Sequence, residues 1–348
     1  MGLNPAAPRA APLAAPPAAG PPPAAVLAVD AGNSKTDAAL VSADGTVLGT
    51  GRSGGFQPPR TGVEAAVDVL GQAVVEAAEA AGLRPDGPYA QQVSACLANA
   101  DLPVEERRLA DAIGARGWGT ATEVRNDTFA VLRAGLTAPG APYGVAVVCG
   151  AGINCVGVAP DGRTARFPAL GRISGDWGGG SGLAAEVLWW AARAEDGRGG
   201  PTELASAVPG HFGFARMAGL IEALHLGAVA YERTHELVPV LFAVAAAGDP
   251  VASAIVERQA GEVVAMASVA LARLGMLGEE VPVLLGGGVL AAGHPQLNGA
   301  IESGLAEAAP RARISVVVAP PVLGAGLLGL DAVGAPPEAY GKLRAHFG

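Results

Sequence analysis

The chain has 348 residues, and its 23 Lys and Arg against 32 Asp and Glu give a net charge of −9. Half of the residues are hydrophobic, which excludes a largely disordered protein. The acidic balance argues against nucleic acid as a partner, because phosphates would be repelled.

Residues 1–24 are expected to form a disordered tail rich in Ala and Pro. Eight of the chain's 28 prolines lie there, and Arg9 is its one charged residue. Such a segment cannot bury a core. The remaining residues, about 320 in number, suffice for two lobes of ordinary size.

The first half after the tail predicts a mixed α/β sheet. Asp44-Gly45 between two apolar runs is a strong hairpin signal, and Thr61 with Glu64 has the spacing of a capping box that opens a helix. The pattern predicts strands at 26–30, 37–42, 46–50, 92–97 and 122–125, and helices at 61–81 and 103–117.

The second half begins on the same plan, about 120 residues later. Strands are expected at 144–149, 155–158 and 163–167, joined by a glycine turn and by Asp161-Gly162. This repetition indicates two lobes built alike. Further on, the pattern predicts a mainly helical stretch at 183–274, a strand at 281–285, a strand, turn and helix start within 314–330, and a last helix at 337–346.

Two features indicate the compartment. The longest uncharged apolar stretch, 314–330, contains Pro320 and Pro321, which a membrane-spanning helix would not carry side by side. Cys96, Cys149 and Cys155 form no CxxC pair and no even set for a disulfide framework. We therefore expect a cytoplasmic protein without a membrane partner.

Three glycine turns, each after an apolar strand, are candidates for phosphate and nucleotide binding. In the first, glycine lets backbone N–H groups approach an anion, Lys35 adds a positive charge, and Asp30 suits a hydrated Mg²⁺. On its own, this first segment is equally consistent with a plain strand–turn–strand. The three segments are 30–36, 150–154 and 286–288.

The order of these segments, with Asn126-Asp127 and 321–325, resembles the sugar kinase/actin/Hsp70 superfamily. The match is closest to the N-acetylglucosamine kinase branch of the BadF/BadG/BcrA/BcrD ATPase family. The resemblance implies an α/β fold of duplicated actin-like (ribonuclease H-like) lobes with a cleft between them. The N-terminal lobe would span 25–137 and be completed by a C-terminal helix at about 334–348, and the C-terminal lobe would span 138–333.

The resemblance also implies ATP and Mg²⁺ as cofactors, an amino sugar as the small-molecule partner, and a homodimer. Asp30 would position the metal. The residues implied in nucleotide binding are Gly32, Asn33, Ser34, Lys35 and Thr36 in the first phosphate loop, Gly150, Ala151 and Gly152 in the second, and Gly286, Gly287 and Gly288 in the adenosine loop.

Asp127 is the candidate catalytic base. It follows a strand and precedes a predicted helix at 128–135, and phosphoryl transfer needs a carboxylate to take the hydroxyl proton. From the residues alone a helix N-cap is the more frequent role of such an Asp. The family's catalytic Asp aligns with Asp127, which favours the catalytic interpretation.

The resemblance implies Gln57, Asn126, Asn154 and Asp176 as sugar ligands. Two departures from the family pattern concern this pocket: Gln57 stands where the family commonly has Asn, and Trp177 stands where it has Glu, with two extra glycines nearby. Ala98 to Asp101 follow a predicted strand and could line the sugar pocket, with Asp101 able to bind a free amine, but a solvated loop is the favoured interpretation.

The predicted function is ATP-dependent phosphorylation of the 6-hydroxyl of N-acetylglucosamine. One alternative is a glucosamine kinase, in which Asp101 or Asp176 would bind the ammonium group. Alternatives of another class are an ATPase activator, which needs cysteines placed for an iron–sulfur cluster, and a sugar sensor without catalysis. No DNA-binding motif supports the sensor.

Overall fold

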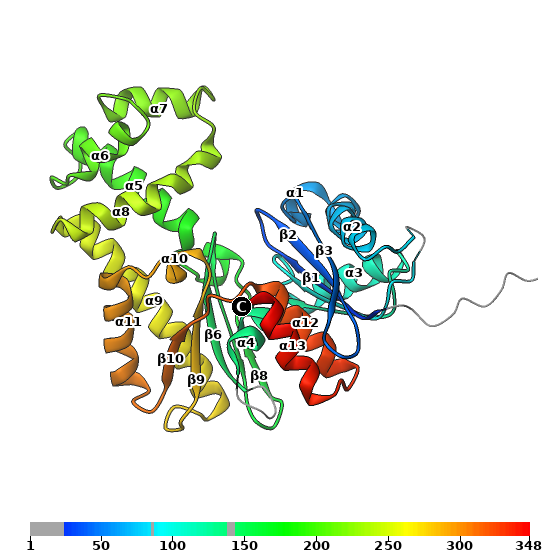
Figure 1. The fold of residues 1–348 in the computed structure, drawn as a ribbon. Helices are drawn as coiled ribbons and strands as arrows, with labels where there is room; N and C mark the ends of the chain where they lie inside the picture. Colours follow the sequence, from blue (N-terminus) through cyan, green and yellow to red (C-terminus); the bar gives the residue numbers. More distant parts are fainter. Residues whose placement is uncertain (1–23, 85–86, 138–142) are drawn as a thin grey trace, which may run out of the picture.

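The computed structural model describes residues 24–84, 87–137 and 143–348, arranged as two α/β lobes (Figure 1). All of the expected tail except Ala24 lies outside the described residues. In the first sheet the strand order is β3-β2-β1-β4-β5. Its strands are β1 (Ala24–Ala31), β2 (Thr36–Val41), β3 (Val47–Ser53), β4 (Ala90–Leu97) and β5 (Gly119–Asn126).

The second sheet repeats this topology, with the order β8-β7-β6-β9-β10. In both sheets the first strand pairs antiparallel with the next strand and parallel with the fourth. The duplication expected from the two glycine turns is therefore confirmed. The strands are β6 (Gly144–Cys149), β7 (Ile153–Val158), β8 (Thr164–Arg166), β9 (Pro282–Gly286) and β10 (Arg313–Val316).

The first sheet is covered by α1 (Pro58–Thr61), α2 (Val63–Ala80) and α3 (Pro103–Gly114) on one side, and α4 (Asp127–Gly135) follows β5. Leu27 and Val93 of the sheet bury against Leu70 of α2. The predicted capping box at Thr61 is wrong. Gly62 has a φ of +84°, which ends α1 at Thr61 and makes Gly62 itself the N-cap of α2.

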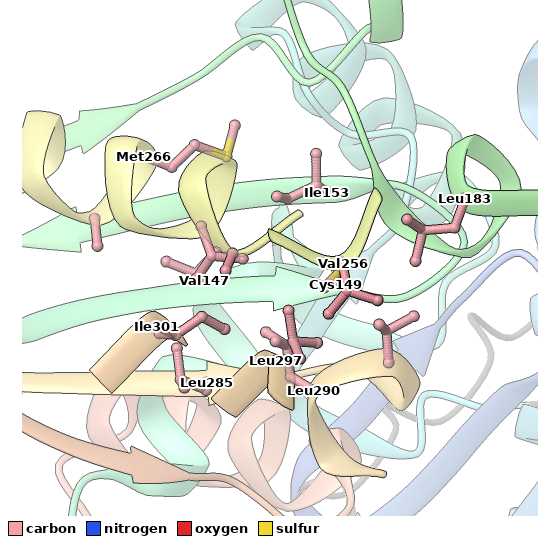
Figure 2. Packing of buried hydrophobic residues seen from close by; sticks show 14 of the residues in the cluster. Val147, Cys149, Ile153, Leu183, Val256, Met266, Leu285, Leu290, Leu297 and Ile301 are labelled. Atoms are coloured by element: carbon pink, nitrogen blue, oxygen red, sulfur yellow. The ribbon is translucent and has the colours of Figure 1, made fainter. Parts of the chain in front are cut away.

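The second sheet packs against two long helices, and Figure 2 shows this core. Val147 and Leu285 of the sheet lie in one buried cluster with Val256 of α9 and Ile301 of α11. The helices of this half are α5 (Gly179–Glu195), α6 (Leu204–His211), α7 (Met217–His225), α8 (Leu237–Ala246), α9 (Pro250–Leu274), α10 (Gly288–Ala291) and α11 (Pro295–Ala308), with 3-10 turns at Gly171–Ser174 and Tyr231–Glu236.

The last two helices, α12 (Pro321–Ala332) and α13 (Pro337–Phe347), return to the first sheet (Figure 1). A Cβ at Gly324 would lie 1.8 Å from the carbonyl oxygen of Ala130, so α12 and α4 touch backbone to backbone. Ser94 of β4 donates to the Ala325 carbonyl at 2.7 Å. Thus α12, which the sequence prediction includes in the second lobe, lies against the first sheet together with α13.

No single helix within 24–84, 87–137 and 143–348 is both long and apolar enough to cross a membrane. The segments Tyr231–Ala246 and Pro250–Leu274 meet that test only as a pair bent by 113°. Leu241 and Val256 of this pair are buried in the core of the second lobe.

Candidate functional site

A cavity of about 520 Å³ opens between the two lobes and collects most of the predicted site residues. The first lobe contributes Asp30, Asp127 and the turn after β1, and the second contributes the turn after β6 and the glycines after β9. The lining consists of Asp30, Gly32, Asn33, Ser34, Lys35, Ala98, Asn99, Asp101, Asp127, Val131, Val148, Gly150, Ala151, Gly152, Ile153, Asn154, Ala169, Gly287, Gly288 and Pro321.

Strand topology explains why these residues meet. β1, β4 and β5 are parallel neighbours, with Asp30 paired to Cys96 and Leu97 paired to Asn126. The carboxyl ends of parallel strands lie at one edge of a sheet, which is where ligands bind in such folds. The residues that follow these strands therefore face the same cavity.

Asp127 is the first residue of α4, and its neighbour Asn126 provides the cap. The Asn126 Oδ1 accepts from the Thr128 N–H at 3.1 Å and from the Thr128 hydroxyl at 2.6 Å. The N-cap interpretation of Asp127 is therefore wrong, and the Asp127 carboxylate lies at the cavity. Burial raises its pKa to about 6, although the N–H groups of Thr128 and Asp127 oppose the shift.

Asp30 is a buried carboxylate in a negative environment. Its pKa is raised to about 8, chiefly by burial, then by the charges of Asp127 and Asp37, against the lowering effect of Lys35. A hard divalent cation would relieve this unfavourable charge, and carboxylate oxygen is the ligand that Mg²⁺ prefers. No group of three or more His, Cys, Asp or Glu within the described residues could hold a metal. Mg²⁺ commonly keeps several waters and nucleotide oxygens instead, so the site fits it.

The first glycine turn is closed by a hydrogen bond from the Gly32 N–H to the Lys35 carbonyl at 2.9 Å. Lys35 is half-exposed and pairs with Asp37 at 2.9 Å. The Thr36 hydroxyl, expected among the phosphate ligands, is buried and donates to the Gly54 carbonyl at 2.9 Å. Thr36 thus anchors the turn on the side away from the cavity, and residues 32–35 line the cavity.

The second turn, 150–152, is supported by the start of α5. The Gly180 N–H donates to the Gly150 carbonyl at 2.7 Å. Gly179 has a φ of +71°, and a Cβ there would lie 2.4 Å from the Gly152 carbonyl carbon. Gly179 is therefore needed to let α5 approach this turn.

Gly287 and Gly288 line the cavity, but Gly286 does not. A Cβ at Gly286 would lie 2.4 Å from Cγ1 of Val131, so this glycine makes room for α4. Gly287 has a φ of +84° and lies against the Cys149 carbonyl.

Of the four predicted sugar ligands, Asn154 lines the cavity. Gln57 donates its amide to the Asn33 carbonyl at 2.8 Å and accepts from Arg60, outside the cavity lining. Asp176 also lies outside the lining and accepts from the Gly171 N–H at 3.2 Å. Asn126 is buried beside the lining, where it caps α4.

Asp101 belongs to the site. The solvated-loop interpretation is wrong, because the residue is partly buried and lines the cavity. Its Oδ1 accepts from Nδ2 of Asn126 at 2.9 Å and of Asn154 at 3.3 Å. The available signal was its place just after β4, the strand between the strands that carry Asp30 and Asn126.

A model of the BadF/BadG/BcrA/BcrD ATPase family matches residues 27–329. The chain is 26% identical over 268 residues to an N-acetylmuramic acid/N-acetylglucosamine kinase of Clostridium acetobutylicum, covering 76% of this chain and 85% of that protein. It is 25% identical over 210 residues to an N-acetyl-D-glucosamine kinase of Dictyostelium discoideum, covering 60% of this chain and 65% of that protein.

Solved structures share the fold. A Chromobacterium violaceum protein provisionally assigned as an N-acetylglucosamine kinase is 24% identical, with a TM-score of 0.68 over 88% of this chain and 98% of that one. A ROK family glucokinase of Streptomyces griseus, solved with glucose and AMPPNP, is 18% identical, with a TM-score of 0.55 over 88% of this chain and 98% of that one. The actin-like sugar-kinase fold is thereby confirmed.

Proposed function

We propose that this chain, which belongs to the BadF/BadG/BcrA/BcrD ATPase family, is an ATP-dependent kinase for the 6-hydroxyl of N-acetylglucosamine. The names of the two relatives support a sugar kinase that acts on amino sugars. The observation that carries the proposal is Asp127, a partly buried carboxylate at the start of α4, which Asn126 caps, and which faces a cavity between two glycine turns.

Asp127 accepts the proton of the sugar hydroxyl as the hydroxyl oxygen attacks the γ-phosphorus. The bond from that phosphorus to the oxygen of the departing ADP breaks, and the proton stays on the Asp127 carboxyl group. A pKa of about 6 keeps this carboxylate ionised at neutral pH yet basic enough to take a proton.

The phosphates of ATP are held by the backbone N–H groups of 33–35 and 151–152, because the Gly32 and Gly150 N–H groups close their own turns. Asp30 would hold Mg²⁺, which would supply positive charge against the phosphates. Closure of the lobes then excludes water, so that ATP is not simply hydrolysed. The base of the nucleotide packs on the bare backbone of Gly287 and Gly288.

The sugar is oriented first by Asn154, which lines the cavity. Asn126 acts indirectly, through the cap that positions Asp127. Gln57 and Asp176 are proposed as further sugar contacts. Both are engaged in local hydrogen bonds outside the cavity lining, so their contact requires lobe closure. We propose a homodimer by the family resemblance, and a cytoplasmic location from the cysteine usage.

A glucosamine kinase is the second candidate, favoured by the Asp101 carboxylate in the cavity. The test is ADP release with ATP, Mg²⁺ and a panel of N-acetylglucosamine, glucosamine, N-acetylmannosamine, glucose and no sugar. Release that depends on N-acetylglucosamine supports the main proposal, and preference for glucosamine supports the second. Release that is indifferent to every sugar contradicts both.

A further inference from the structure

Asp101 stands where the loop after β4 meets the start of α3, and it lies at the lobe boundary. Its neighbours come from both halves of the chain: Asn126 ends β5 of the first sheet, and Asn154 belongs to β7 of the second. Asp101 lines the cavity, and the proposed function uses its carboxylate neither for phosphate binding nor for proton transfer.

The backbone of Asp101 is fixed at both ends. Its N–H donates at 3.1 Å to the Glu105 carboxylate, and this carboxylate also caps the first turn of α3. Its carbonyl accepts from Nη2 of Arg166 at 3.3 Å. Arg166 belongs to β8 and forms an ion pair with Glu106 at 2.9 Å, so it reaches this loop from the other lobe.

The side chain of Asp101 is fixed through one oxygen only. Oδ1 accepts from the amides of Asn126 at 2.9 Å and of Asn154 at 3.3 Å. Within the part of the chain that the structure describes, Oδ2 accepts no hydrogen bond. A carboxylate has about four acceptor positions, so the arrangement leaves an oriented acceptor at the cavity.

The surroundings make this acceptor electrostatically costly. Burial raises the pKa of Asp101 to about 7, and the charges of Asp127 on α4 and Glu105 on α3 add to the rise. The Arg166 charge and the Asn126 hydrogen bond lower it. A hydrogen-bond donor from a ligand would stabilise the ionised form, since an ionised group makes the stronger hydrogen bonds.

We propose that Asp101 is a specificity-determining residue that binds the sugar through Oδ2, accepting a hydrogen bond from a polar hydrogen on the ring substituents. The donor is a hydroxyl group or an ammonium group. This inference rests on the proposed function of the same cavity, and it assigns Asp101 to the sugar, apart from proton transfer and from the phosphates.

The test is the variant Asp101→Asn in the full chain. Its amide oxygen can still accept from Asn126 and Asn154, while an NH₂ replaces the acceptor at Oδ2. Losing a hydrogen bond to a charged group predicts a rise of about 10-fold or more in the KM and Kd for the sugar. The KM for ATP should stay within about 2-fold of wild type. Asp111→Asn, on the exposed face of α3, is the matched control for removal of one charge.

Two sugars identify the donor. An equal loss for N-acetylglucosamine and glucosamine indicates a hydroxyl donor, and a loss at least about 10-fold larger for glucosamine indicates its ammonium group. An unchanged sugar Kd in Asp101→Asn overturns the inference. If the wild-type protein still phosphorylates the sugar, the kinase proposal stands. Wild-type protein that turns over no sugar instead contradicts the kinase proposal itself.

A second measurement does not depend on the variant's folding. The sugar Kd of the wild-type protein, measured from pH 8 to pH 6, should rise as Asp101 takes up a proton near pH 7. A sugar Kd that stays flat across this range overturns the inference.

Discussion

Asn154 of the second lobe donates a hydrogen bond from Nδ2 to Oδ1 of Asn126 in the first lobe, at 3.2 Å. The same Asn126 oxygen caps α4, the helix that begins with Asp127. A contact between the two halves of the chain therefore acts on the helix terminus that presents the proposed base.

Asn126→Ala should lower both stability and kcat. Loss of the cap costs about 1 kcal/mol, and the buried Thr128 N–H is left without its partner. Because the helix start then shifts, we expect kcat to fall about 10-fold or more. Chemical denaturation and steady-state kinetics measure the two effects.

The matched control is Asp249→Ala. Asp249 caps α9 through the Ala252 N–H at 2.8 Å, far from the cavity lining. The Asp249→Ala variant should lose about as much stability as Asn126→Ala and keep the kcat of the wild type. Equal kcat values for the two variants would contradict the positioning role of Asn126.

Arg166→Met should lower kcat more than Arg125→Met does. The two guanidinium groups lie over the same Phe129 ring, at 5.5 and 5.6 Å from its centroid. Arg125 pairs with Glu123 of its own strand, whereas Arg166 joins Glu106 across the lobes. Glu106 also accepts from the Asn126 N–H at 3.2 Å, so loss of Arg166 loosens the strand end before Asp127.

The check is the kcat of the two arginine variants and of the double variant that combines Glu106→Gln with Arg166→Met. We expect the double variant to be about as impaired as Arg166→Met alone, because both changes break one contact. Additive losses, or equal losses for the two arginines, would contradict this role.

Gly179→Ala should impair the second phosphate turn. Its φ of +71° disfavours any Cβ, and the added carbon would lie 2.4 Å from Gly152. We expect a loss of more than about 1 kcal/mol in stability and a raised KM for ATP. Gly182→Ala in the same helix meets nothing within 4 Å and should be neutral or stabilising by about 0.5–1 kcal/mol. Thermal melts of the two variants measure the change in stability, and ATP titrations measure the change in KM.

Much of the fold and site could be predicted from the sequence. The apolar strands and their glycine turns are local signals, and their repetition indicates the duplicated lobes. The capping prediction at Thr61 failed because the positive φ of Gly62 overrode a correct spacing. Asp101 was undervalued because its burial depends on Asn154 and Arg166, which are distant in sequence. The same holds for Gln57, whose amide donates to the carbonyl of the distant Asn33, whereas Asp176 is held by its neighbours Gly171 and Ser174.

The ligand-free protein should lose stability as the pH rises from about 4 to 8. Asp30 has a pKa of about 8 in the folded chain against 3.8 as an ordinary Asp, so its stabilising contribution is complete below pH 4 and is lost as the pH rises through 8. Asp30→Asn removes this charge. It should raise Tm at pH 8 in metal-free buffer and abolish kinase activity. A variant that is less stable than wild type at pH 8 would contradict the buried-charge account.

The most direct test of the account is sugar-dependent ADP release by Asp127→Asn beside wild type, with ATP, Mg²⁺ and N-acetylglucosamine. The amide keeps the shape of the carboxyl group but cannot take the hydroxyl proton. General-base catalysis contributes about 10²–10⁴-fold, so kcat should fall by at least about 100-fold while the thermal midpoint stays near or above that of wild type. Turnover within a few-fold of wild type would contradict the assignment of Asp127 as the base.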